Sequence, residues 1–142
     1  MRRDFSISLP LRFAHCDSAG IAYYPRYFEL CDAAVEDWTD FALAASRRTL
    51  HLELGLALPT VSLEATFSAP SYLGDLLDLR LSVLRVGNSS IVLETNVTSG
   101  GEQRLCATQT LVLMDMKTTK SRPWPARWRE RLVELQRQES LV

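Results

Sequence analysis

The chain has 142 residues, a formal net charge of −1 at pH 7, 46% hydrophobic residues and 23% charged residues. This composition is ordinary for a globular protein and excludes a collagen-like, coiled-coil or disordered chain. The length fits one domain, and we expect residues 1–142 to form it. No apolar run approaches the roughly 20 residues of a membrane-spanning helix. The first ten residues also lack the continuous apolar region of a signal peptide, so we expect a cytoplasmic protein with no membrane partner.

The sequence contains no motif that predicts a metal site, a cofactor site or a nucleic-acid-binding site. The three cysteines, Cys16, Cys31 and Cys106, form no CxxC pair, and we expect reduced thiols. The two histidines, His15 and His51, have neither HxxxH nor HExxH spacing, so no metal site is predicted. The GxxxxGK(S/T) and GxGxxG phosphate loops and the common nucleic-acid-binding motifs are absent. We therefore predict no cofactor and no nucleic-acid partner.

The first half of the chain predicts a strand, a loop and a long helix. Residues 5–13 alternate apolar and polar side chains, which is typical of a half-buried strand, and Pro10 favours an edge position or a bulge. Residues 15–20 have the composition of a loop. Pro25 suits the first turn of a helix, and apolar residues then recur at steps of three and four as far as residue 45. A helix about 20 residues and about 30 Å long with this much apolar surface must be wrapped by other elements.

The second half predicts a sheet. A short helix is expected at 47–54, followed by strands over 61–67, 77–83, 91–97 and 103–116, and a final amphipathic helix after Pro125. Four consecutive strands with short turns favour an antiparallel meander. The predicted class is therefore α+β, with a curved antiparallel sheet wrapped around the 25–45 helix. The last strand is apolar on both faces, so we expect it to lie inside the sheet and at the interface of a homo-oligomer.

The junction between the first strand and the long helix is the candidate site. Asp17 lies on the loop before Gly20, and the helix opens at Tyr24–Pro25. The first turn of a helix presents unpaired N–H groups, which can bind a polarised carbonyl oxygen as an oxyanion hole does. A carboxylate on the preceding loop can attack that carbonyl carbon or activate water, and His15 is a candidate for tuning it. The alternative is that Asp17 only caps a turn.

The stretch CDSAGIAYYPRYFELCDAA (16–34) resembles the signature of the 4-hydroxybenzoyl-CoA thioesterase family, which carries the pattern D-x-A-G-I-x-Y-Y-P-x-Y. Segments 67–83 and 86–94 resemble the family's second strand pair and its Gly-x-x-Ser hairpin, so nearly the whole chain is covered. The resemblance implies a hotdog fold and hydrolysis of an acyl-CoA to the free acid and CoA, without metal or cofactor. It also implies an active site at a dimer interface, in dimers that pair into homotetramers.

The resemblance implies a role for individual residues. Asp17 matches the nucleophile or general base, and the backbone N–H of Tyr24 matches the oxyanion donor. Substrate contacts are expected from Gly20, Tyr23, Pro25, Tyr27, Leu58, Pro59 and Thr60. Contacts with CoA are expected from the hairpin residues Asn88, Ser89 and Ser90, with Arg85 as a further candidate.

The acyl group and the partner of the CoA phosphates remain open at this stage. Members that act on aromatic acids carry basic residues in the hairpin, where this chain has Val86-Gly87-Asn88. A small aromatic and a short aliphatic acyl group both remain candidates. The segment 117–131, with six Lys or Arg and one Glu, is a candidate for the phosphates. A non-catalytic module that binds acyl-CoA is the alternative function.

Overall fold

The computed structural model describes the backbone of residues 5–140 and the side chains of residues 5–136. The elements follow in the order β1 (Phe5–Pro10), η1 (Phe13–His15), α1 (Tyr24–Leu43), η2 (Thr49–Glu53), β2 (Leu56–Ala57), β3 (Thr60–Phe67), β4 (Leu76–Val86), β5 (Ser90–Ser99), β6 (Glu102–Val112), β7 (Met114–Asp115) and α2 (Ala126–Ser140). Of these, η1 is one turn of 3₁₀-helix and η2 is one turn of π-helix.

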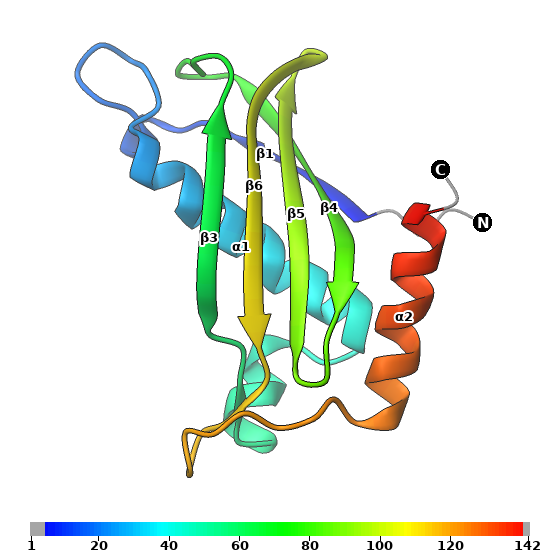
Figure 1. The fold of residues 1–142 in the computed structure, drawn as a ribbon. Helices are drawn as coiled ribbons and strands as arrows, with labels where there is room; N and C mark the ends of the chain where they lie inside the picture. The colour runs from blue at the N-terminus through cyan, green and yellow to red at the C-terminus, as the bar shows by residue number, and fades with distance from the viewer. Residues whose placement is uncertain (1–4, 141–142) are drawn as a thin grey trace.

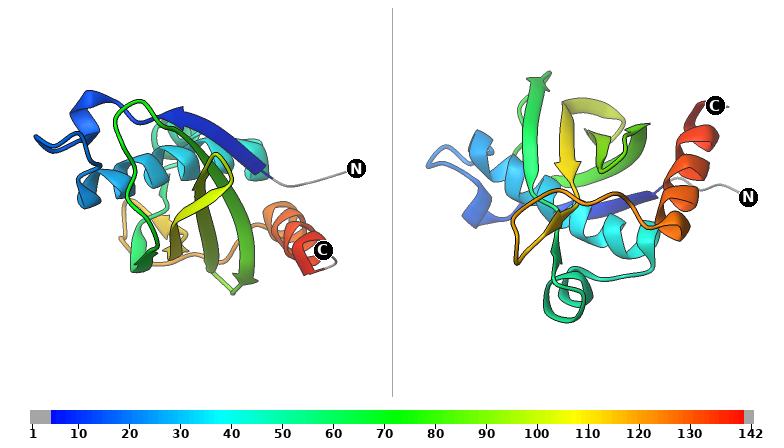
Figure 2. Two further views of the ribbon diagram at one scale, coloured as in Figure 1. Left: turned by 90° about the horizontal axis from the view of Figure 1, so that it is seen from above. Right: turned by 60° about the horizontal axis from the view of Figure 1, so that its bottom comes forward.

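One antiparallel sheet and one long helix dominate the fold. The strand order of the sheet is β1-β4-β5-β6-β3, and β2 and β7 form a separate small pair. Helix α1 runs obliquely across one face of the curved sheet, and α2 lies beside β4 (Figure 1). The view from above in Figure 2 places the loop before α1 and helix α2 at opposite sides of the molecule. The expected α+β arrangement of a sheet around a central helix is confirmed.

Helix α1 supplies the middle of the core. Its buried side chains recur every three or four residues: Tyr27, Leu30, Cys31, Ala34, Val35, Trp38, Thr39, Ala42 and Leu43. They belong to the same buried cluster as the inward-facing leucines of the sheet, such as Leu79, Leu93 and Leu111. Each such leucine contributes about 1.5–3 kcal/mol relative to an exposed position. Ala44 ends the helix in a left-handed conformation, with φ of 53°.

The predicted meander is correct only for β4, β5 and β6. Strand β3 pairs with β6 instead of β4, and β1 takes the place beside β4. Residues 68–75 therefore cross from one side of the sheet to the other, and β3 is left as an edge strand. An alternating pattern predicts that a strand exists but does not identify its neighbour, which is why the pairing of β3 was missed.

The last strand lies inside the sheet, between β5 and β3, as predicted. It ends at Val112 rather than at residue 116, because Met114 and Asp115 pair with β2 instead. The uncovered edge next to it is β3.

The first strand is shorter than predicted. It ends at Pro10, and Arg12 opens the η1 turn, in which its N–H donates to Nδ1 of His15 at 2.9 Å. Phe13 is consequently 78% exposed instead of packing with the strand. The predicted edge position of Pro10 is confirmed, since β1 is an edge strand beside β4 in the described sheet.

The C-terminal helix agrees with its pattern. Trp128, Leu132 and Leu135 of α2 are buried. The expected short helix at 47–54 is the π turn η2. No helix within residues 5–140 has the length and apolar character needed to cross a membrane.

Candidate active site

The loop that carries Asp17 is tightly closed. The backbone N–H of Asp17 donates to the carbonyl of Ile21 at 2.8 Å, and Oδ1 of Asp17 accepts the N–H groups of Ala19 (2.9 Å) and Ile21 (3.2 Å). Gly20 makes the reversal possible, since its φ of +77° strains any residue with a side chain. Asp17 therefore does cap its own turn, but only through one carboxylate oxygen. Among the described residues, none donates a hydrogen bond to Oδ2, and the side chain is exposed.

The first turn of α1 presents one free donor next to this loop. The Tyr23 N–H donates to the carbonyl of His15, and the Arg26 N–H donates to the carbonyl of Tyr23. Pro25 has no N–H. Within the described chain, no acceptor faces the backbone N–H of Tyr24. This group lies at the positive end of a 20-residue helix and can bind an oxygen that carries negative charge.

Tyr24, which carries that donor, also lines a cavity of about 340 Å³. Its walls are Ile21, Ala22, Tyr24, Tyr27, Phe67, Ser68, Ala69 and Pro70. The ring of Phe67 lies 6.2 Å from that of Tyr24 and 5.8 Å from that of Tyr27, between centroids. Rings prefer tilted and edge-to-face contacts with other rings, so this wall suits a planar aromatic group. Asp17 does not line this cavity. It makes two hydrogen bonds with Ile21, which does line it.

The expected substrate and CoA residues fall into two groups. The first group lies around the loop before α1 and its first turn, at the upper left of Figure 1. It consists of Asp17, Gly20, Tyr23, Tyr24, Pro25 and Tyr27. The second group lies at the opposite end of the strands, where β3 begins and β4 turns into β5. It consists of Leu58, Pro59, Thr60, Arg85, Asn88, Ser89 and Ser90. The seven residue steps of β3 separate the two ends by about 24 Å. One chain does not bring the two groups together.

The start of β3 borders two further hollows along α1. One, of about 120 Å³, is lined in part by Thr60, Asp32 and Gln109, and Nε2 of Gln109 donates to Oγ1 of Thr60 at 2.6 Å. The other, of about 630 Å³, is lined in part by Thr60 and by Leu58, which is almost wholly buried. Glu29, Asp32, Glu36 and a single guanidinium, that of Arg47, supply the charges of this hollow. The excess of carboxylates makes it unsuitable for phosphate groups.

The β4–β5 hairpin is held by the segment that follows β7. The Trp124 N–H donates to the carbonyl of Asn88 and its indole N–H to that of Ser90, both at 3.0 Å. Arg129 donates to the carbonyl of Gly87 at 2.7 Å. A Cβ at position 87 would collide with Oγ of Ser90, so a residue with a side chain fits there only if the Ser90 hydroxyl moves. The predicted CoA hairpin and the basic segment 117–131 are thus in contact.

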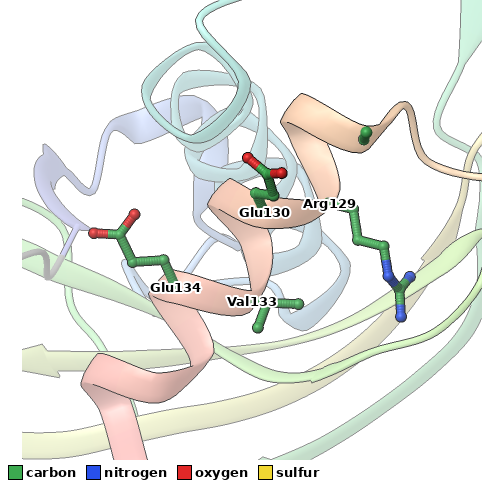
Figure 3. Close-up of a pocket in the computed structure, with 5 residues that line it drawn as sticks. Arg129, Glu130, Val133 and Glu134 are labelled. Carbon is green, nitrogen blue, oxygen red and sulfur yellow. The ribbon is translucent and has the colours of Figure 1, made fainter.

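A separate cavity of about 570 Å³ lies along α2. Its described lining residues are Ala126, Arg129, Glu130, Val133 and Glu134, all on that helix. Figure 3 shows Glu130 and Glu134 one turn apart on the same side, with Arg129 pointing away from them. None of these described residues lines the cavity beside α1.

Sequence reasoning missed the residues that support the site. Arg104 on β6 is buried and donates to Asp75 and to Ser71, which in turn accepts a hydrogen bond from the hydroxyl of Tyr27. Segment 69–75 was interpreted only as a turn. In the sequence, the only sign of this role is that Arg104 is a charged residue near the start of a strand that is otherwise largely uncharged.

Among the described residues, the cysteines and acidic side chains do not form a second reactive site or a metal site. Burial, helped by the charge of Asp32, raises the pKa of the Cys31 thiol to about 12, so it stays neutral and unreactive. Cys16 and Cys106 are free, and burial also raises the pKa of each. Within the described residues, no three His, Cys, Asp or Glu side chains converge as metal ligands would.

A family model described as the thioesterase-like superfamily matches residues 11–132. The chain belongs to this superfamily. The hotdog fold and the thioester hydrolase class that its motif implied are thereby confirmed. A 1,4-dihydroxy-2-naphthoyl-CoA hydrolase from Synechococcus elongatus is 27% identical over 126 residues, which cover 87% of this chain and 91% of that protein.

Two solved structures share the fold of this superfamily member. A 1,4-dihydroxy-2-naphthoyl-CoA thioesterase from Synechocystis superposes with a TM-score of 0.80 at 21% identity, covering 93% of this chain and 97% of that one. A gentisyl-coenzyme A thioesterase superposes with a TM-score of 0.79 at 23% identity, covering 86% and 97%.

Proposed function

We propose that the protein hydrolyses an acyl-CoA with a small aromatic acyl group to the free acid and CoA. The observation that carries the proposal is the unpaired backbone N–H of Tyr24, a residue that lines a cavity walled by aromatic rings, next to the loop of Asp17. The named relatives act on 1,4-dihydroxy-2-naphthoyl-CoA, and a structural neighbour acts on gentisyl-CoA, both with aromatic acyl groups. The ring contacts of Phe67 favour such a group over a short aliphatic one.

Asp17 and Tyr24 divide the chemistry between them. The thioester oxygen accepts the Tyr24 N–H, and negative charge develops on it as the carbonyl carbon is attacked. Through Oδ2, Asp17 either takes a proton from the attacking water or attacks the carbon itself, giving an anhydride that water then cleaves. The C–S bond breaks, and CoA leaves as a thiolate that takes up a proton. The two backbone bonds to Oδ1 hold the carboxylate in one orientation during either route.

A dimer built on β3 accounts for the two separated groups of residues. Strand β3 is an edge strand whose Val61, Leu63 and Phe67 are exposed, and it carries no lysine or proline that would block pairing. If β3 pairs antiparallel with β3 of a second copy, the start of each strand lies beside the end of the other. The partner's 58–60 segment would then lie beside the Phe67 end of this chain. Each active site would take Asp17 and Tyr24 from one copy and its pantetheine contacts from the other, and such dimers can pair into tetramers.

The oligomer is tested by adding one charge to the edge. A Val61→Lys substitution places an ammonium group in the proposed seam, which natural edge strands use to prevent pairing. We expect the wild type to elute as a dimer or tetramer in size-exclusion chromatography with light scattering. The variant should be monomeric and inactive while remaining folded by circular dichroism. A monomeric, fully active wild type would contradict the composite site.

The activity itself is tested by release of CoA thiol. The panel consists of 1,4-dihydroxy-2-naphthoyl-, gentisyl-, benzoyl-, phenylacetyl- and acetyl-CoA. Thiol is detected with a disulfide reagent, and a no-substrate control measures the protein's own Cys16 and Cys106. We expect kcat/KM to be highest for an aromatic member. Binding without thiol release from any member would instead support the non-catalytic module. A cytoplasmic location and a single domain over residues 1–142 stay predictions of the same proposal.

A further inference from the structure

A buried arginine stands behind the candidate site. Arg104, near the start of β6, is only 8% exposed. Its Nη1 lies 2.7 Å from Oδ2 of Asp75 and 3.0 Å from both the carbonyl of Pro70 and Oγ of Ser71. Its Nε lies 2.8 Å from a Glu102 carboxylate oxygen but is not aligned for a hydrogen bond with it. A buried guanidinium is costly unless acceptors surround it. Here the hydrogen-bond acceptors all come from one crossover loop, and Glu102 adds only a nearby negative charge.

Arg104 holds this loop, residues 68–75, at two places. Its own backbone carbonyl accepts the N–H of Ser68 at 2.9 Å, where the loop leaves β3. Its side chain binds Pro70, Ser71 and Asp75 further along. Asp75 in turn accepts the N–H of Tyr72 at 2.9 Å, so the carboxylate closes the loop on itself. One residue therefore fixes both halves of the crossover.

The crossover loop in turn holds the loop of Asp17. The Ala22 N–H donates to the carbonyl of Ser71, and the Leu73 N–H donates to the carbonyl of Gly20, both at 2.9 Å. Ile21 and Tyr72 form an antiparallel bridge between the two loops. The hydroxyl of Tyr27 donates to Oγ of Ser71 at 2.6 Å, which ties the first turn of α1 to the same residue.

We propose that Arg104 is a positioning residue for the reaction, acting through loop 68–75 to fix the Tyr24 N–H, the Asp17 loop and the wall of the acyl cavity. Ser68, Ala69 and Pro70 of that loop are themselves part of the wall. Arg104 does not line the cavity, and it acts only through the loop. The expected effect on kcat rests on the proposed function. The ordering of the two loops by Arg104 is a property of the fold and does not.

The ion pair at the centre of this arrangement persists over a wide pH range. Hydrogen bonds from the Tyr72 N–H and the Arg104 guanidinium lower the pKa of Asp75. The bond to Asp75 raises the pKa of Arg104, against the opposing effect of burial. Both partners therefore stay charged wherever a thioesterase is assayed.

The test compares Arg104→Gln and Arg104→Lys with Arg48→Gln, an exposed arginine on the turn before η2, as the matched control. We expect Arg104→Gln to lower kcat by about 100-fold, because small displacements of reacting groups cost rates of this size. KM should change by less than about threefold, because binding in the ground state is retained. Arg104→Lys keeps the charge beside Asp75 and should recover part of the loss. Arg48→Gln should match the wild type.

Amide hydrogen exchange supplies a readout that does not depend on activity. At a temperature well below unfolding, Arg104→Gln should accelerate exchange in peptides covering residues 16–24 and 68–75, and not in β5. Ser71→Ala removes both hydrogen bonds accepted by Oγ of Ser71, from the Tyr27 hydroxyl and from Nη1 of Arg104, but leaves the Arg104–Asp75 ion pair in place. It should reproduce the effect on 16–24 and serves as the second variant if Arg104→Gln does not fold. The proposal is overturned if exchange in 16–24 is unchanged in these variants, or if kcat of the folded variants equals that of the wild type. Absence of thiol release by the wild type would refute the proposed function alone, because the exchange result would still decide the role of Arg104.

Discussion

Replacing Asp17 by asparagine separates the two things that its carboxylate does. Oδ1 accepts the N–H groups of Ala19 and Ile21, and Oδ2 has no donor among the described residues. Asparagine keeps a carbonyl oxygen in the place of Oδ1 and replaces Oδ2 by an NH₂ group, whose lone pair is delocalised into the carbonyl and can neither take a proton nor attack a carbonyl carbon. The turn should therefore survive while the chemistry is lost.

The magnitudes of the two effects differ enough to be distinguished. Bonds to a charged acceptor contribute about 1 kcal/mol more than bonds to a neutral one when buried. Because this loop is exposed, we expect the free energy of unfolding to fall by at most about 1 kcal/mol, or a few degrees in Tm. Loss of a general base lowers kcat by about 10²–10⁴-fold, which corresponds to about 3–5 kcal/mol in the barrier.

The assay is thiol release from the best aromatic substrate, with thermal unfolding of the same samples. Asp40→Asn, which neutralises an exposed carboxylate near the other end of α1, is the matched control and should leave kcat unchanged. Asp17→Ala should lose both activity and stability, because it also removes the acceptor of the two N–H groups. The reasoning is refuted if Asp17→Asn keeps kcat within threefold of the wild type, or if Asp40→Asn loses as much.

Three further predictions concern the surroundings of the site. Phe67→Ala removes the ring that contacts Tyr24 and Tyr27, and should raise KM about tenfold for an aromatic acyl-CoA but not for acetyl-CoA; an equal rise for both would argue against an aromatic pocket. Trp124→Phe removes the bond from the buried indole N–H to the hairpin, and should lower the free energy of unfolding in urea by about 1–2 kcal/mol. For Asp75, the pKa is lower in the folded chain than in the unfolded one, so its stabilisation is complete above about pH 4 and is lost as pH falls through the folded value. The stability difference between wild type and Asp75→Asn should consequently shrink below about pH 4, and a difference that grows there would contradict the assigned bonds.

Local patterns in the sequence predicted most of the elements. The three- and four-residue spacing from Tyr27 to Leu43 identified α1, and Trp128, Leu132 and Leu135 identified the buried side of α2. These features are local, because helix periodicity depends only on neighbours along the chain. The motif around Asp17 and Tyr24 located the candidate site for the same reason.

Features that depend on distant partners were not predictable in this way. The position of β3 at the edge comes from its pairing with β6, about 40 positions later in the chain, for example Ala65 with Ala107. Arg104 has no distinctive neighbour in the sequence, since its partners are 29 and 33 positions earlier. The separation of Leu58–Thr60 from Tyr24 follows from strand direction, which a motif does not encode.

The most direct test of the central claim removes the single donor at the start of α1. Incorporating the α-hydroxy acid analogue of tyrosine at position 24 replaces the backbone N–H by an ester oxygen and leaves the side chain unchanged. Because no described residue accepts a hydrogen bond from that N–H, the folded state should lose little stability. We predict that kcat falls by about 10²–10³-fold with KM nearly constant, as for other oxyanion donors. An ester-containing protein that hydrolyses acyl-CoA at the wild-type rate would contradict the account.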